Sequence, residues 1–225
     1  MDFSSKRILV VGASGVLGAE ITRMLTAKGA QVLATARTQD SAANIPAEAA
    51  VRLLVDLTSP ESISVLTSYL IANEDIDGVI LAAGRVGFGF VADTSSTHAR
   101  ALTQINFHGP AQLVTELLPA LKGKDEAFVA AITGVVAEKT FAGMAAYCAS
   151  KSALSAWLGA LALEIRRDKI TVVDARPGHT ETGLATRPLF GAAPQMPEGM
   201  TPAQVAARLI SGIEAGEKVI SSSEF

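Results

Sequence analysis

The nine residues VVGASGVLG (10–18) decide the fold, because they join a short apolar run to the first amphipathic segment. The glycines at 12, 15 and 18 permit a tight turn and let a phosphate approach bare backbone. A helix that begins behind such a turn supplies N–H donors and a positive dipole. We interpret the stretch as a phosphate-binding turn, with a turn needed only for packing as the alternative. Its spacing is G-x-x-G-x-x-G, so the G-x-G-x-x-G dinucleotide fingerprint does not match.

Short apolar runs alternate with helical patterns on both sides of this turn. Most runs are continuous, as in parallel strands that are covered on both faces. The expected strands are 8–11, 32–36, 51–55, 78–82, 128–132, 170–174 and 218–220. The pattern predicts an α/β fold, a doubly wound parallel sheet of about seven strands in a single domain spanning residues 1–225. Ligands of such sheets bind beyond the carboxyl ends of the strands, where the strand order reverses.

Proline and hydroxyl residues mark the helices between these runs. Ser59-Pro60 and Thr201-Pro202 each provide a capping side chain followed by proline in the first turn. Pro110 predicts a kink or break near Gly109 in the apolar segment 101–121.

Composition limits the classes of function. The net charge of −3 is spread over 19 basic and 22 acidic residues without a basic stripe, which speaks against a nucleic-acid partner. No signal peptide and no apolar run of ~18–20 residues is found, so we expect a cytoplasmic protein with no membrane partner. The single cysteine, Cys148, excludes an internal disulfide.

The residue after the second expected strand bears on the choice of nucleotide. An Asp or Glu there would bind the ribose hydroxyls of NAD(H) and repel a 2′-phosphate. This chain has Arg37, whose guanidinium attracts a phosphate and can bind it through two hydrogen bonds. We therefore prefer NADP(H) as cofactor, with NAD(H) still open and a solvated surface arginine as the alternative.

Tyr147 and Lys151 are the candidate catalytic pair. Four residues apart on a helix, they lie on one face. A nearby ammonium favours the phenolate, so we expect Lys151 to lower the pKa of Tyr147 from its ordinary value near ~10 toward the range useful for proton transfer. An ordinary helix-face contact is the alternative for this pair taken alone.

Together with the glycine turn, the AAG at 82–84, Asn106 and the ProGly at 177–178, this pair makes the chain resemble the short-chain dehydrogenase/reductase family from about residue 7 to 182. The resemblance implies hydride transfer between a nicotinamide and a carbonyl or alcohol substrate. It implies Tyr147 as acid/base, Lys151 as ribose ligand and Asn106 as holder of a water. The cofactor-binding positions it implies are Gly12, Ser14, Gly15, Val16, Leu17, Gly18, Arg37, Asp56, Leu57, Ala83, Gly84, Lys151, Pro177, Gly178 and Thr182.

One departure from the family pattern concerns catalysis. The position of the family's catalytic serine, thirteen residues before the tyrosine, is Gly134, and no serine lies between Ser96 and Ser150. Loss of one such donor to the substrate oxygen costs ~10²–10³ in rate. We take Thr133 as the candidate surrogate donor, although neighbouring strand residues point to opposite faces.

The sequence thus predicts an NADP(H)-dependent oxidoreductase, and Gly134 motivates the alternative of an NADP(H)-binding redox sensor or scaffold with little turnover. By the resemblance we expect a homodimer or homotetramer, a small-molecule substrate and no metal. The segment 183–197 is either a lid over the substrate or a connector.

Overall fold

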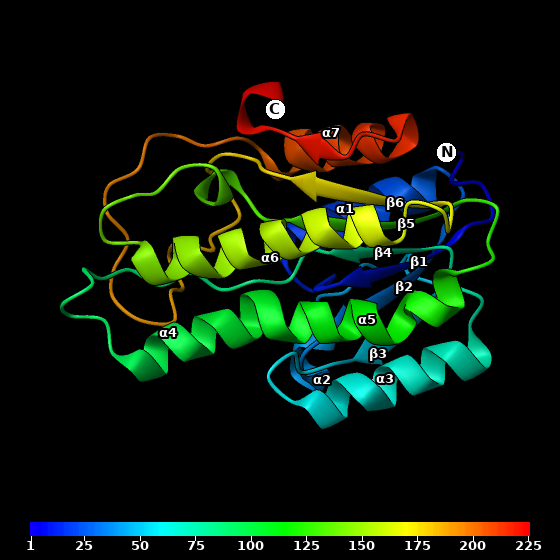
Figure 1. The fold of residues 1–225 in the computed structure, drawn as a ribbon, viewed down its shortest axis with the longest axis horizontal. Coiled ribbons are helices and arrows are strands. Elements are labelled where there is room, and N and C mark those ends of the chain that lie inside the picture. Colours follow the sequence, from blue (N-terminus) through cyan, green and yellow to red (C-terminus); the bar gives the residue numbers. More distant parts are fainter.

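Seven parallel strands form one sheet in the order β3-β2-β1-β4-β5-β6-β7 (Figure 1). The computed structural model describes residues 1–225. The strands are β1 Arg7–Val11, β2 Gln31–Ala36, β3 Val51–Leu54, β4 Gly78–Leu81, β5 Ala127–Ile132, β6 Ile170–Ala175 and β7 Val219–Ile220. Every predicted strand is present, because runs such as β1, β2 and β4 are buried on both faces as parallel strands require. The predicted doubly wound fold is confirmed.

Helices cover both faces of this sheet (Figure 1). They are α1 Val16–Ala27, α2 Gln39–Ala42, α3 Pro60–Asn73, α4 Ser96–Thr103, α5 Gly109–Leu121, α6 Ala145–Glu164 and α7 Pro202–Ala215. Two apolar clusters separate the layers: α3, α5 and α6 contribute to the first, and α1, α2 and α7 to the second. The sheet therefore has a core on each side and leaves mainly its strand ends open to a ligand.

The predicted helix starts are confirmed. The side chain of Ser59 accepts a hydrogen bond from the N–H of Ser62, and Thr201 forms a reciprocal capping box with Gln204. The expected break near Pro110 is a π turn, Gln104–His108, that runs directly into α5. Pro110 lies in the first turn of α5, where its missing N–H costs little, so the helix widens instead of ending.

The strand order reverses at β1, which pairs with β2 on one side and with β4 on the other. The connections leaving β1 and β4 therefore diverge to opposite faces of the sheet and open a crevice at their carboxyl ends. This is the place that the sequence pattern predicted for a ligand.

The segment 183–197 lies along the chain that follows β4. The N–H of Phe88 donates to the carbonyl of Phe190 at 3.0 Å, and the N–H of Leu189 donates to the carbonyl of Val86 at 2.8 Å. The Phe190 ring also stacks on His98, with centroids 4.6 Å apart. Leu184 and Arg187 of this segment line the crevice.

Candidate active site

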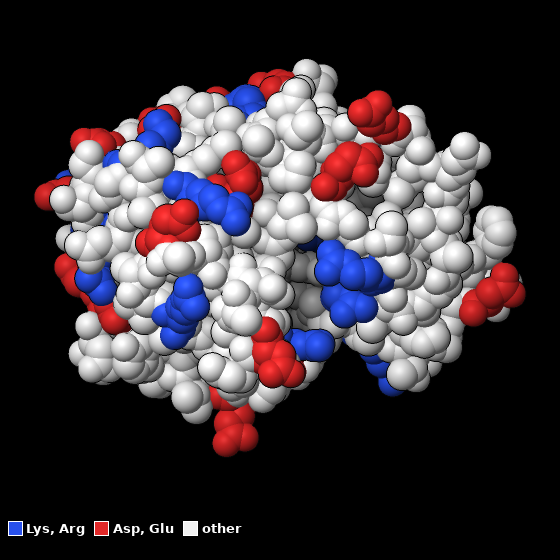
Figure 2. All heavy atoms as spheres, turned by 180° about the vertical axis from the view of Figure 1, so that it is seen from behind, with Lys and Arg blue, Asp and Glu red and all other residues white.

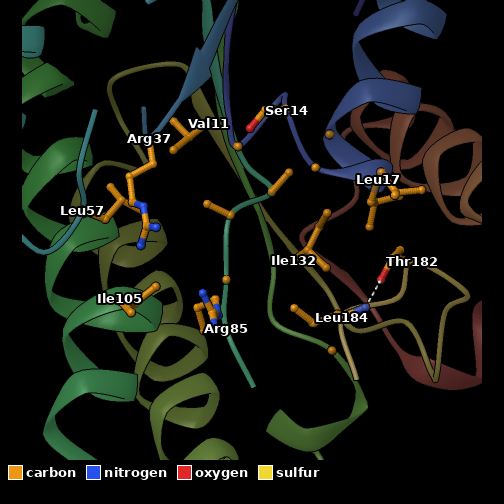
Figure 3. A pocket seen from close by; sticks show the side chains of 18 of the residues that line it. Val11, Ser14, Leu17, Arg37, Leu57, Arg85, Ile105, Ile132, Thr182 and Leu184 are labelled. Atoms are coloured by element: carbon orange, nitrogen blue, oxygen red, sulfur yellow. Dashed lines mark hydrogen bonds between the residues drawn. The ribbon is translucent and has the colours of Figure 1, made fainter. Parts of the chain in front are cut away.

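A cavity of about 490 Å³ opens at the carboxyl ends of the strands (Figure 3). Of the predicted site residues, only Asn106 lies outside the lining, buried behind Gly84. The predicted residues that do line it are Gly12, Ser14, Gly15, Val16, Leu17, Gly18, Arg37, Asp56, Leu57, Ala83, Gly84, Thr133, Tyr147, Lys151, Pro177, Gly178 and Thr182. Residues far apart in the sequence thus converge on one cavity.

The glycine turn has the properties of a phosphate cradle. Gly12 has a φ of +88°, and a Cβ there would lie 2.8 Å from the Cα of Ala83, so only glycine fits. Helix α1 begins at Val16 with no side chain capping it and no acidic residue in its first turn. Its first N–H groups are therefore free to meet an anion that the helix dipole also favours. This donor set fits the pyrophosphate of a dinucleotide.

Arg37 and Asp56 lie at the ends of β2 and β3 and line the same cavity. Burial alone would raise the pKa of Asp56, but hydrogen bonds from Thr58 and the Arg37 guanidinium hold that pKa below its usual range. Asp56 is therefore ionised at neutral pH. Arg37 is exposed and forms no salt bridge, so its guanidinium is free to bind a phosphate.

Lys151 points toward the end of β5. Its ammonium donates to the carbonyl of Ile132 at 2.7 Å, and the residue is 5% exposed. Burial lowers the pKa of Lys151 to about 8, against an opposing effect of Asp174. Lys151 is thus mainly cationic at pH 7 and loses its charge as the pH rises through about 8.

The expected lowering of the pKa of Tyr147 is absent in this structure. Burial raises the pKa of Tyr147 to about 12, and the neighbouring Cys148 adds to the rise. No hydrogen bond joins the phenol to Lys151, whose ammonium is bonded to the Ile132 carbonyl instead. Desolvation of the phenolate therefore dominates, and Tyr147 carries its proton at neutral pH.

Asn106, in the π turn, holds the backbone after β4. Its Oδ1 accepts from the N–H of Arg85 at 2.9 Å, while its Nδ2 donates to the carbonyl of Arg85 at 2.8 Å and to Ser150 Oγ at 3.0 Å. A Cβ at Gly84 would lie 3.3 Å from both Asn106 Oδ1 and Lys151 Nζ. Both N–H groups of the Asn106 amide are therefore used, and the side chain fixes this segment beside Lys151.

The structure argues against Thr133 as the surrogate for the missing serine. Thr133 is 1% exposed, and its hydroxyl donates to Asp174 Oδ1 at 2.5 Å. A hydroxyl has one proton to donate, so Thr133 has none left for a substrate oxygen. Our expectation is corrected on this point: Thr133 anchors β5 to β6.

Replacing Thr133 by valine should lower the free energy of unfolding by about 1.5–3 kcal/mol, because Asp174 loses a charged hydrogen bond. The kcat should stay within about threefold of wild type. Urea unfolding and steady-state kinetics measure the two quantities. Thr115→Val is the control, since that exposed hydroxyl bonds only within its own helix and its loss should change stability by less than about 0.5 kcal/mol. A kcat reduced ~100-fold with stability intact would restore Thr133 as the donor.

Gly134, at the position of the missing serine, has a φ of +84°. A Cβ there would meet only the Pro177 carbonyl and Val136 at ordinary distances, so space is not the obstacle. The obstacle is the backbone, since φ +84° with ψ +166° is a region that essentially only glycine adopts, and a side chain there costs about 1–3 kcal/mol. A serine at 134 would therefore be strained.

Two arginines in the cavity were missed by the sequence analysis. Arg85 directly follows the AAG at 82–84, and Arg187 lies in the segment that crosses it. The position of Arg85 after a recognised motif was a usable signal, and Arg187 lies in the segment 183–197 that the sequence analysis offered either as a lid or as a connector.

The fold and this cavity define a doubly wound α/β nucleotide-binding protein. A family model described as short chain dehydrogenase matches residues 6–188. The chain belongs to the short-chain dehydrogenase family. The family and the fold expected from the sequence are thereby confirmed.

Relatives and solved structures agree with this assignment. The chain is 32% identical to the uncharacterized oxidoreductase YbbO of Escherichia coli over 79% of its own length, and the match covers 66% of YbbO. A short-chain dehydrogenase from Streptomyces avermitilis superposes with a TM-score of 0.85 at 27% identity, over 97% of this chain and 88% of that one.

Two further structures share the fold and contain a nucleotide. A Sphingobium yanoikuyae enzyme in complex with NADPH has a TM-score of 0.85 at 23% identity, over 96% of this chain and 87% of that one. A Burkholderia phymatum enzyme in complex with NAD has a TM-score of 0.87 at 18% identity, over 98% and 90%. None of the helices of our chain is both long and apolar enough to cross a membrane.

Proposed function

We propose that this chain is an NADP(H)-dependent oxidoreductase that transfers hydride between the nicotinamide and a carbonyl or alcohol substrate. The supporting observation is the cavity itself, which Tyr147 and Lys151 share with the uncapped start of α1 and with Arg37. The proposal assigns Tyr147 as proton donor, Lys151 and Asn106 as its supporting residues, and the glycine turn as the phosphate site. Residues 1–225 would act as one domain within a homodimer or homotetramer.

A nicotinamide held beside Lys151 would supply a hydride to the carbonyl carbon of the substrate, and the electron pair of the C=O π bond would pass to the substrate oxygen. Tyr147 donates its phenolic proton to the substrate oxygen, which completes the alcohol, and then recovers a proton from solvent. Because Tyr147 holds its proton at neutral pH, reduction is the direction that this protonation state favours. The proposal has the Lys151 ammonium exchange the Ile132 carbonyl for the phenol, so that its charge stabilises the phenolate left behind.

A direct test is a panel of aldehydes, ketones and alcohols assayed with each nicotinamide. We expect NADPH consumption with at least one carbonyl class. The alternative of a redox sensor or scaffold rests on Gly134. Micromolar NADPH affinity without turnover of any panel member would favour that alternative.

Cofactor preference has its own test at Arg37. Arg37→Gln should weaken NADPH binding by about 10- to 100-fold and change NADH binding by less than about threefold, because only NADPH offers the 2′-phosphate. Fluorescence titration of each reduced nucleotide measures both affinities. Arg52→Gln is a matched control, since this arginine on the neighbouring β3 does not line the cavity. Equal weakening of both nucleotides would argue against a 2′-phosphate contact.

A further inference from the structure

Arg85 is a cation in the cavity that the proposed chemistry does not use. Its guanidinium forms one hydrogen bond, from Nη2 to the carbonyl of Arg187, and that bond is long at 3.4 Å. Its Nε is buried without a partner, and no carboxylate forms a salt bridge with it. A guanidinium carries five N–H donors, and buried donors normally have an acceptor. The buried Nε of Arg85 has none in this structure.

The backbone holds Arg85 in place despite this deficit. The side chain of Asn106 bonds both its N–H and its carbonyl, and the preceding Gly84 lies beside Lys151. Figure 3 shows both Arg85 and Arg37 among the side chains that line the cavity. Arg85 is therefore attached to a fixed backbone segment, and its side chain is half-buried in the cavity.

The side chains that line the cavity carry more positive than negative charge, which favours an anionic ligand. Arg37, Arg85, Lys151 and Arg187 line it, whereas Asp56 is its one acidic side chain. Arg187 donates hydrogen bonds from its Nε to the carbonyl of Gly183 and from its Nη2 to the carbonyl of Thr182, each at 3.1 Å. In Figure 2, Lys and Arg side chains border the hollow on this side of the molecule. The phosphates of a dinucleotide would bind at the start of α1 and at Arg37. Arg85 would then still have no anionic partner.

We propose, resting on the proposed oxidoreductase function, that Arg85 binds a carboxylate of the substrate. The substrate class is then an oxo acid, reduced to the hydroxy acid. The planar fork of a guanidinium matches a carboxylate through two parallel hydrogen bonds. Arg85 directly follows Gly84, where a Cβ would lie 3.3 Å from the Lys151 ammonium, so the proposal sets this carboxylate on the Lys151 side of the cavity. The buried Nε of Arg85 gains the acceptor that the protein does not provide.

The kinetic test compares oxo acids with their matched oxo amides at saturating NADPH. Wild type should prefer the acids, and Arg85→Gln should reduce the acid-to-amide ratio of kcat/KM by about 10- to 100-fold, the effect of a charge-assisted hydrogen bond. Arg85→Lys should retain part of the preference. Arg100→Gln is the control, since it removes the same charge from exposed α4 outside the cavity and should leave the ratio unchanged.

A binding test keeps this proposal separate from turnover. In a Tyr147→Phe background saturated with NADPH, the oxo acids should raise the melting temperature and the amides should not, and Arg85→Gln should abolish the difference. Acid-specific stabilisation without turnover in wild type would support Arg85 while refuting the oxidoreductase. Equal stabilisation by acids and amides, none by either, or an Arg85→Gln defect confined to NADPH affinity would overturn the proposal.

Discussion

Replacing Tyr147 by phenylalanine should lower kcat for carbonyl reduction by about 10²- to 10⁴-fold, the usual contribution of a positioned proton donor. NADPH affinity should stay within about threefold of wild type, because the hydroxyl is proposed to act on the substrate. Stopped-flow reduction of the best carbonyl and fluorescence titration of NADPH separate the two effects.

The chain offers a matched control in its second tyrosine. Tyr69 lies on α3, is 41% exposed and contacts only Glu74 through its hydroxyl, so Tyr69→Phe should leave kcat unchanged. The pH profile adds a further check. Since burial raises the pKa of Tyr147 to about 12, the proton donor persists across neutral pH, and alcohol oxidation, which needs the phenolate, should accelerate as the pH rises. Wild-type kcat in Tyr147→Phe would remove Tyr147 from the mechanism.

Replacing Asp174 by alanine should lower the free energy of unfolding by about 3 kcal/mol, as expected when one member of a buried ion pair is removed. Asp174 is 3% exposed and accepts hydrogen bonds from Thr133, Ser155 and Arg176. The loss should fall at the low end of the range for buried pairs, because Arg176 is partly exposed and keeps Glu138 within 3.6 Å. Urea unfolding gives the value directly.

An exposed aspartate provides the control for this change. Asp125 is fully exposed and lies 3.7 Å from Lys169, so Asp125→Ala should change stability by less than about 0.5 kcal/mol. A loss at Asp174 no larger than that control would mean that its network does not stabilise the fold.

The isosteric variant Asp174→Asn tests a link to the site. The Asp174 charge opposes the burial that lowers the pKa of Lys151 to about 8. Without that charge the pKa of Lys151 should fall further, so the loss of carbonyl-reductase activity as the pH rises should begin at a lower pH. An unshifted pH profile would show that Asp174 does not influence Lys151.

Much of the fold followed from local patterns. Continuous apolar runs predicted all seven strands, and Ser59 and Thr201 marked helix starts that the structure confirms. Such signals are readable because burial on both faces of a sheet and the capping of free N–H groups act over a few residues. Pro110 was harder to interpret, because its effect depended on whether the helix could widen into a π turn before it.

Chemical identity and order along the chain determined the candidate site: a glycine turn after the first strand, Arg37 after the second, and Tyr147 with Lys151 on one helix face. Their roles remain proposals. Only the tertiary structure shows which hydrogen-bonding groups of these residues already have a partner within the protein. Thr133 gives its proton to Asp174, Lys151 bonds the Ile132 carbonyl, and Arg85 remains unmatched. Hydrogen-bond partners and desolvation come from residues distant in sequence, so spacing along the chain cannot reveal them.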